Sequence, residues 1–270
     1  MMKNNIRYYQ DETKDDFCHT KTNKNVIVGD EYNYYSKNIF FNLFSFCTYY
    51  LIAFPILYFF CYFIKGIRVK NRKRIKNVKG GAILYSNHTS IIDAYIGPVM
   101  LTPFKRCYIV GNKDAVSIKG ISLLVKSLGC LPVPDTTRGL IRMNKSVSEI
   151  LNDKKRIIIF PEAHIWHGYT GLRPFPETSF RFASSNNVPA IPIAVTYQFR
   201  KGFLKHKKPR MVIHVGEPIY GKEELSVKEN AKYLSVQTEK AVKEMLYKHN
   251  NYARFTYIKN IDNEEENLTY

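Results

Sequence analysis

The longest uncharged segment of this chain runs from Ile39 to Ile64, and it constrains the fold more than any other feature. Phenylalanine, tyrosine, leucine and isoleucine dominate it, and it contains no Asp, Glu, Lys or Arg. A helix of about 26 residues is about 39 Å long, which exceeds the thickness of a bilayer core. The segment begins too late and is too long for a signal peptide. Residues 39–64 are therefore expected to form a membrane anchor.

Two geometries for this anchor remain open. Pro55 lies near the middle of the segment, and the polar residues Asn42, Ser45 and Thr48 precede it. A bend at the proline would give a shallow hairpin buried in one leaflet. A straight helix would instead cross the bilayer once.

The charges on the two sides of the anchor differ. Residues 1–38 carry six basic and six acidic side chains, and their polar composition predicts a poorly ordered tail. Residues 65–79 carry eight basic side chains and no acidic one. By the positive-inside rule, residues 65–270 are expected to form a domain on the cytoplasmic side of the membrane.

The net charge of +18 on 270 residues predicts an anionic partner. Because the basic run directly follows the apolar anchor, an anionic lipid surface explains it better than RNA, and no nucleic-acid partner is expected. The five cysteines are scattered without CxxC spacing, which disfavours a zinc ribbon and a disulfide framework and is typical of a reducing compartment.

After the anchor, short apolar runs alternate with amphipathic stretches. This alternation predicts an α/β domain with a mostly parallel sheet and helices on both of its faces. The expected strands are residues 82–85, 107–110, 156–160, 191–195 and 211–215. The expected helices are residues 91–100, 118–128, 140–151, 178–184 and 227–248.

A histidine and an aspartate follow the first of these strands. His88 and Asp93 are five residues apart, an offset of about 140° on a regular helix, so they meet only if His88 lies in the turn before the helix. A histidine oriented by a carboxylate is a general base near neutral pH. The alternative is purely structural: Ser90 and Asp93 fit a capping box, with His88 an ordinary loop residue.

A second polar cluster follows the strand at 156–160. Pro161 ends that strand and Glu162 comes next, while Arg173 lies in a loop that leads into a helix. The ends of parallel strands meet at one edge of a sheet, so His88 and Glu162 are expected to lie at the same edge. Arg173 is a candidate ligand for phosphate, because a guanidinium matches phosphate oxygens in a two-pronged way.

Four ordered blocks together resemble the glycerolipid acyltransferase family, which includes the 1-acyl-glycerol-3-phosphate acyltransferases. Residues 87–93 resemble its NHxxxxD block, and Phe160-Pro161-Glu162 resembles its FPEG block. Arg173-Pro174-Phe175 stands where a Lys-Pro-Phe loop is usual, and residues 188–193 resemble its proline-containing fourth block. The chain departs from the family at Ala163, where a glycine is usual, and at Thr178.

The resemblance implies a role for each of these residues. His88 is expected to be the general base and Asp93 its orienting partner. The expected substrate-binding residues are Glu162, Arg138, Arg173, Asn87 and Ser90. Arg138 is displaced from the family pattern, because Thr136 and Thr137 separate it from the preceding acidic residue.

The resemblance also implies a reaction. A fatty acyl group would pass from acyl-CoA or acyl-acyl-carrier-protein to the free hydroxyl of a lysophospholipid, above all 1-acyl-glycerol-3-phosphate, to give phosphatidic acid. No metal or other cofactor is expected. Two alternatives stay open: a different glycerophosphate or lysolipid acceptor, and a membrane-tethered thioesterase or hydrolase that uses the same histidine and aspartate with water.

Overall fold

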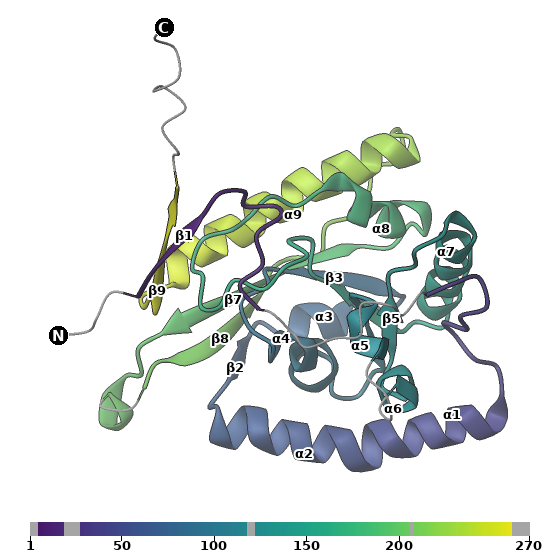
Figure 1. Cartoon of the computed structure of the whole chain (residues 1–270), viewed down its shortest axis with the longest axis horizontal. Helices are drawn as coiled ribbons and strands as arrows, with labels where there is room; N and C mark the ends of the chain where they lie inside the picture. The colour runs from purple at the N-terminus through teal and green to yellow at the C-terminus, as the bar shows by residue number, and fades with distance from the viewer. Residues whose placement is uncertain (1–4, 19–27, 118–121, 206–207, 261–270) are drawn as a thin grey trace, which may run out of the picture.

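The computed structural model describes residues 5–18, 28–117, 122–205 and 208–260 (Figure 1). Its centre is a seven-stranded sheet in the order β2-β8-β7-β3-β6-β4-β5, in which every neighbouring pair is parallel except β7 and β8. The strands are β2 (Arg68–Lys70), β3 (Ala82–Ser86), β4 (Cys107–Gly111), β5 (Cys130–Pro132), β6 (Arg156–Ile159), β7 (Ala190–Gln198) and β8 (Arg210–Val215).

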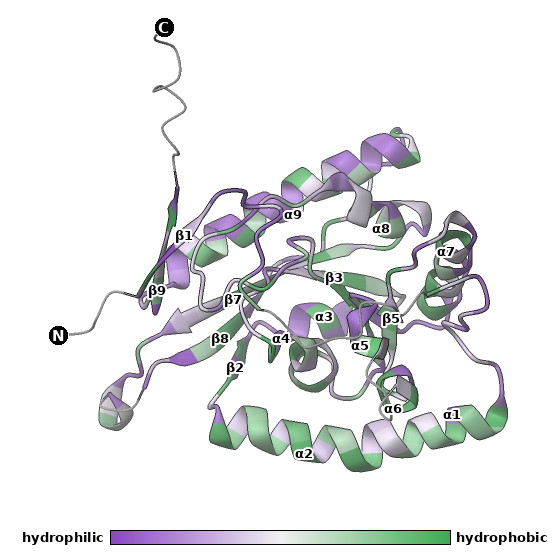
Figure 2. Cartoon of the chain, in the orientation of Figure 1, coloured by the Kyte–Doolittle hydropathy of each residue, from purple (hydrophilic) through white to green (hydrophobic). Residues whose placement is uncertain are grey.

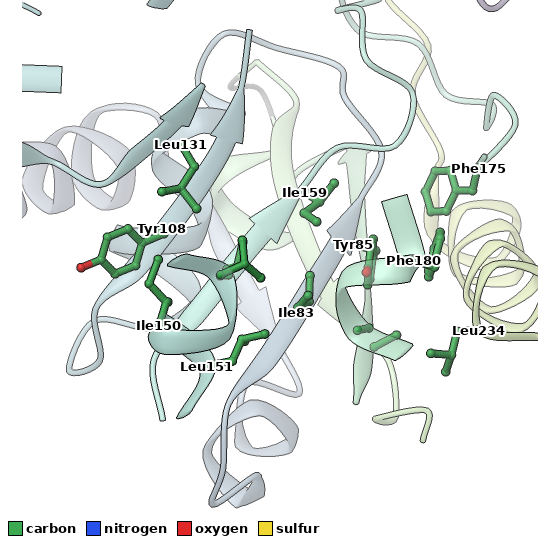
Figure 3. Close-up of a cluster of buried hydrophobic side chains, with 14 of the residues drawn as sticks. Ile83, Tyr85, Tyr108, Leu131, Ile150, Leu151, Ile159, Phe175, Phe180 and Leu234 are labelled. Carbon is green, nitrogen blue, oxygen red and sulfur yellow. The ribbon is translucent and has the colours of Figure 1, made fainter. Parts of the chain in front are cut away.

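Helices cover both faces of this sheet, which confirms the predicted α/β class. Along β3, Ile83 and Tyr85 pack on one face and Ala82 and Leu84 on the other, because successive side chains of a strand point in opposite directions. The first face packs against α7 (Thr137–Asn152), α8 (Arg181–Ser185) and α9 (Val227–His249), and Figure 3 shows this cluster. The second face packs against α3 (Lys73–Asn77), η3 (Ile96–Leu101) and part of the apolar segment.

The remaining short elements connect these layers. They are α4 (Asp93–Tyr95), α5 (Asp114–Ser117), α6 (Ser122–Ser127), η4 (Glu177–Phe180) and η5 (Gly202–Leu204). The helix predicted over 118–128 begins in residues that lie outside the described part of the chain. The helix predicted over 91–100 starts at Asp93, after a turn.

The prediction that residues 1–38 form a disordered tail is wrong for the described part of that segment. Strand β1 (Asn5–Tyr9) pairs in parallel with β9 (Phe255–Lys259) near the other end of the chain. Val28 and Tyr34 are buried in the cluster on the α7 face, at 2% and 6% exposure. A segment of polar composition can still be ordered when its few apolar side chains find partners far away in the sequence.

The apolar segment is one continuous rod from Ile39 to Ile64, which contradicts the hairpin alternative (Figure 2). It consists of α1 (Ile39–Phe46), η1 (Cys47–Ala53), α2 (Phe54–Phe59) and η2 (Phe60–Ile64). Pro55 falls in the first turn of α2, directly after the π-helical stretch η1, and the backbone stays helical through it. The rod is long and apolar enough to cross a membrane, and 17% of its most apolar window is buried.

One side of the rod contacts the domain, and the other side is exposed. Ser45 Oγ donates to the Ser127 carbonyl at 2.6 Å, and Tyr49 Oη lies 3.4 Å from the Pro98 carbonyl. Large apolar side chains fill the exposed side: Ile39, Phe40, Leu43, Leu51, Ile52, Ile56, Phe59, Phe63 and Ile64. The rod therefore has an apolar surface that the rest of the described chain does not cover.

Candidate active site

The structure brings His88 and Asp93 together at the end of β3. His88 lies in the turn after the strand, and Asp93 is the first residue of α4. His88 Nδ1 is 3.1 Å from Asp93 Oδ2; the aspartate side chain is fully buried, and the histidine side chain is 14% exposed. The Nδ1–H bond to a carboxylate fixes the tautomer and leaves Nε2 as the proton acceptor.

Asp93 also caps the start of its own helix. Its Oδ2 accepts hydrogen bonds from the backbone N–H groups of Thr89, at 2.6 Å, and Ser90, at 2.8 Å. One oxygen therefore orients the histidine and closes the turn, and only one half of the predicted capping box, the bond from the Ser90 N–H to Asp93, is present. The same contacts place Ser90 in the turn itself, where its Oγ accepts from the Ile92 N–H at 3.3 Å.

Glu162 supports the histidine from the neighbouring strand. Tyr85 of β3 pairs with Ile159 of β6, so the two strands end at the same edge, as the sequence predicted. The backbone N–H of His88 donates to Glu162 Oε2 at 2.9 Å. The His88 ring also stacks on Phe160, with 4.3 Å between centroids and 21° between planes. The turn that carries the base is therefore held by the loop after β6.

Arg173 neutralises Glu162 in the interior. Their side chains are each 1% exposed, and Arg173 Nη2 lies 3.0 Å from Glu162 Oε2. The Arg173 N–H donates to the other carboxylate oxygen at 2.9 Å. Burial raises the pKa of Glu162, and the charge of Arg173 and the backbone donors oppose that rise. Both residues, predicted to bind substrate, are here occupied by protein groups and face away from solvent.

Ala163 stands where the family usually has a glycine, and its backbone conformation is one that favours glycine. Its φ is +62°, in the left-handed region that glycine occupies at no steric cost. The usual glycine would suit this turn better, so the alanine keeps the backbone path at an energetic cost of about 1–2 kcal/mol.

Asn87 and Arg138 have protein partners in the structure, and their binding of substrate stays a prediction. Asn87 is fully buried, and its amide bonds the backbone N–H and carbonyl of Val195, at 2.8 and 3.1 Å, so it joins the end of β3 to β7. Arg138 lies in the first turn of α7 with its side chain 85% exposed, and Asp30 is its ion-pair partner at 3.9 Å. In the described part of the chain, neither the Asn87 nor the Arg138 side chain forms a hydrogen bond or an ion pair with the His88 imidazole.

His88 lines an apolar cavity of about 450 Å³. One wall comes from the 39–64 rod, through Tyr49, Ala53, Phe54 and Leu57. Other lining residues come from η3, β4, α6 and the loop after β6, and they include Val99, Ile109, Val125 and Phe160. No pattern in the sequence indicates that these residues line a cavity. The apolar pattern of residues 39–64 was the available sequence signal, and it does not indicate which side of the helix faces the domain.

Comparisons with known proteins bear on the family and on the fold. Residues 66–196 match the family model named Acyltransferase. The fold matches the crystal structure of the 1-acyl-sn-glycerophosphate acyltransferase PlsC from Thermotoga maritima, with a TM-score of 0.53 and 18% identity. That match covers 77% of this chain and 88% of PlsC. No curated protein matches the sequence. The family match therefore covers just under half of the chain, and the structural match shows a PlsC-like fold.

Proposed function

We propose that this protein transfers a fatty acyl group from an acyl thioester to the free hydroxyl of a lysophospholipid, with 1-acyl-glycerol-3-phosphate as the preferred acceptor and phosphatidic acid as the product. The observation that carries the proposal is that His88, paired with Asp93, lines an apolar cavity. The cavity volume of about 450 Å³ suits an acyl chain, and one of its walls is the apolar rod itself.

In the proposed reaction, His88 Nε2 takes the proton of the acceptor hydroxyl as that oxygen attacks the thioester carbonyl carbon. A C–O bond forms, the C–S bond breaks, and the imidazolium returns the proton to the leaving thiolate. No acyl-enzyme is needed, because the acceptor oxygen is the nucleophile. Asp93 stabilises the positive imidazolium that exists between the two proton transfers.

The oxyanion of the tetrahedral intermediate needs a hydrogen-bond donor near the turn. The N–H groups of Thr89 and Ser90 are committed to Asp93. Ile91 follows them and lines the cavity, so its N–H is the candidate donor. One such donor contributes roughly 3–4 kcal/mol to transition-state stabilisation.

The proposed position of the protein brings the acyl donor, the acceptor and the membrane surface together. The exposed side of the rod is proposed to lie in the membrane with the catalytic domain on the cytoplasmic face, where acyl-CoA or acyl-acyl-carrier-protein supplies the acyl group. The basic run at 65–79 is proposed to face anionic headgroups. The domain would then work at the surface that holds both lipid substrates.

The test is acyl transfer by the full chain in membranes, with a labelled acyl thioester and a panel of lysolipid and glycerophosphate acceptors. His88→Ala is expected to reduce transfer by about 10²–10⁴-fold, because the reaction loses its general base. His249→Gln is the matched control, since that imidazole lies at the end of α9. Wild-type activity in His88→Ala would contradict the proposal, and release of free fatty acid without acceptor would favour the hydrolase alternative.

A further inference from the structure

The proposed acceptor carries a phosphate, and both arginines predicted to bind it have acidic partners in the protein. Arg173 is buried and neutralised by Glu162, and Arg138 lies at the start of α7 beside Asp30. On the proposed function, the phosphate of the acceptor then needs other cations near the turn that carries His88.

The loop after β6 is attached directly to that turn. The Trp166 N–H donates to the His88 carbonyl at 3.2 Å, and the Gly168 N–H donates to the Thr89 carbonyl at 3.0 Å. His167 lies between these two contacts, so its backbone is fixed beside the catalytic turn. The hydroxyl of Tyr257 donates to the His167 carbonyl at 3.0 Å, which joins the loop to β9.

The segment before β9 brings Arg254 to the same edge of the sheet. A side-chain carbon at Gly168 would be 3.5 Å from Arg254 Cβ. The Asn251 N–H donates to the carbonyl of Tyr197 at 3.2 Å, and Tyr197 Oη lies 2.9 Å from Thr89 Oγ1. The backbone before Arg254 and the Tyr257 side chain after it therefore contact residues that are bonded to the turn carrying His88.

Strand β1 supplies a second arginine next to the first. Arg7 is paired with Tyr257 in the β1–β9 register, its Nη1 is 3.4 Å from Tyr257 Oη, and its guanidinium lies 4.1 Å from the centre of the Phe255 ring. Among the described residues, neither Arg7 nor Arg254 forms an ion pair with an acidic side chain.

The electrostatics of His167 agree with this placement. Burial lowers the pKa of His167, and the positive charges of Arg7 and Arg254 lower it further, while Asp93 raises it. His88 also lowers the pKa of His167, so the charges of both arginines and of the catalytic pair reach one imidazole. A lowered pKa keeps this imidazole neutral at neutral pH, a form that offers one N–H donor.

We propose that Arg254 and Arg7, together with His167, bind the phosphate of the acceptor beside His88. Two guanidinium groups without acidic partners would meet a phosphate dianion in the geometry that guanidinium favours. Both arginines lie outside residues 66–196, so the acceptor site of this chain would be completed by its two terminal strands.

The experiment measures acyl transfer and acceptor binding for Arg254→Gln, Arg7→Gln and Arg254→Lys, with the exposed Arg181→Gln of α8 as the matched control. Each glutamine variant is expected to raise the KM for 1-acyl-glycerol-3-phosphate by about tenfold, with kcat and the donor KM little changed. Arg254→Lys is expected to recover part of the loss. With monoacylglycerol, which has no phosphate, the variants are expected to match the control.

Binding is measured separately from turnover through the fluorescence of Trp166, the only tryptophan in the sequence. Acceptor affinity that falls in both glutamine variants supports the site even if no acyl transfer is detected, and an inactive wild type would then contradict only the proposed function. Wild-type KM and affinity in Arg254→Gln, with the same result in a folded Arg7→Gln, would overturn the inference. Thermal unfolding midpoints close to that of the wild type show that the variants are folded.

Discussion

Asp93 accepts hydrogen bonds from a side chain and from two backbone groups through one oxygen. Asp93→Asn keeps an oxygen that can still cap Thr89 and Ser90, and it removes the charge that stabilises the His88 imidazolium. We expect kcat to fall by about a hundredfold or more, with the acceptor KM unchanged and the fold retained. Steady-state kinetics together with thermal unfolding test this, and a kcat near that of the wild type would assign Asp93 to capping alone.

Glu162 and Arg173 form a buried ion pair, and this predicts a structural effect of substitution. Glu162→Gln leaves the Arg173 charge without its partner, so the free energy of unfolding is expected to fall by roughly 3–5 kcal/mol. Urea unfolding measures the loss. Glu224→Gln is the matched control, because the exposed pair of Glu224 with Lys222 is expected to contribute less than about 1 kcal/mol.

The same variant separates the two roles considered for Glu162. If the carboxylate only positions the His88 backbone, the folded fraction of Glu162→Gln keeps its acceptor KM. A large rise in that KM with little loss of stability would instead return Glu162 to the acceptor site.

At the level of elements, sequence patterns predicted the buried strands and missed the edge strands. Strands β3 and β6 are continuous apolar runs, and burial on both faces requires that pattern. Strands β2 and β5 have three residues each, and their conformation is set by the neighbouring strand rather than by local propensity. The β1–β9 pair joins residues about 250 positions apart, and no local signal encodes that contact.

The candidate site was likewise predicted only in part from the sequence. The contact between His88 and Asp93 is one of the two outcomes that their spacing left open, and the strand ends place Glu162 nearby. The partners of Arg173 and Arg138 depend on how distant segments fold back, so the sequence indicated guanidinium groups without showing whether they are buried or exposed.

The rod forms a wall of the cavity, which makes a prediction about acyl chain length. Ala53 lines the cavity, and its neighbour Ile52 is 57% exposed on the other side of the helix. Ala53→Phe is expected to fill part of the 450 Å³ and shift donor preference toward shorter acyl chains. Competition between acyl thioesters of increasing length measures the shift. Ile52→Phe introduces the same side chain outside the cavity, and an equal shift in that control would contradict the assignment.

For the whole molecule, both flanks of the rod belong to one folded domain. Val28 and Tyr34 lie in the core before it, and Ile67 and β2 join the domain after it. A helix whose two flanks are held by the same domain has both ends on the same side of a membrane. We therefore expect the rod to lie along the lipid surface, with its exposed apolar side in one leaflet.

Cysteine labelling tests this topology. Lys14→Cys reports on the segment before the rod, and Lys228→Cys reports on the domain after it, in a background that lacks Cys18, Cys47 and Cys130. Both introduced thiols are expected to react with an impermeant maleimide from the same face of sealed vesicles. If one of them reacts only after detergent is added, the rod crosses the bilayer.

The shared wall between cavity and rod has a kinetic consequence. Because the apolar helix that is proposed to meet the lipid also lines the cavity beside His88, we expect a substrate acyl chain to pass from the bilayer into the cavity by lateral diffusion. The quantity that saturates the enzyme is then the surface mole fraction of lysolipid. Diluting the vesicles in buffer should leave the rate per enzyme almost unchanged, whereas diluting the lysolipid with inert phospholipid should lower it.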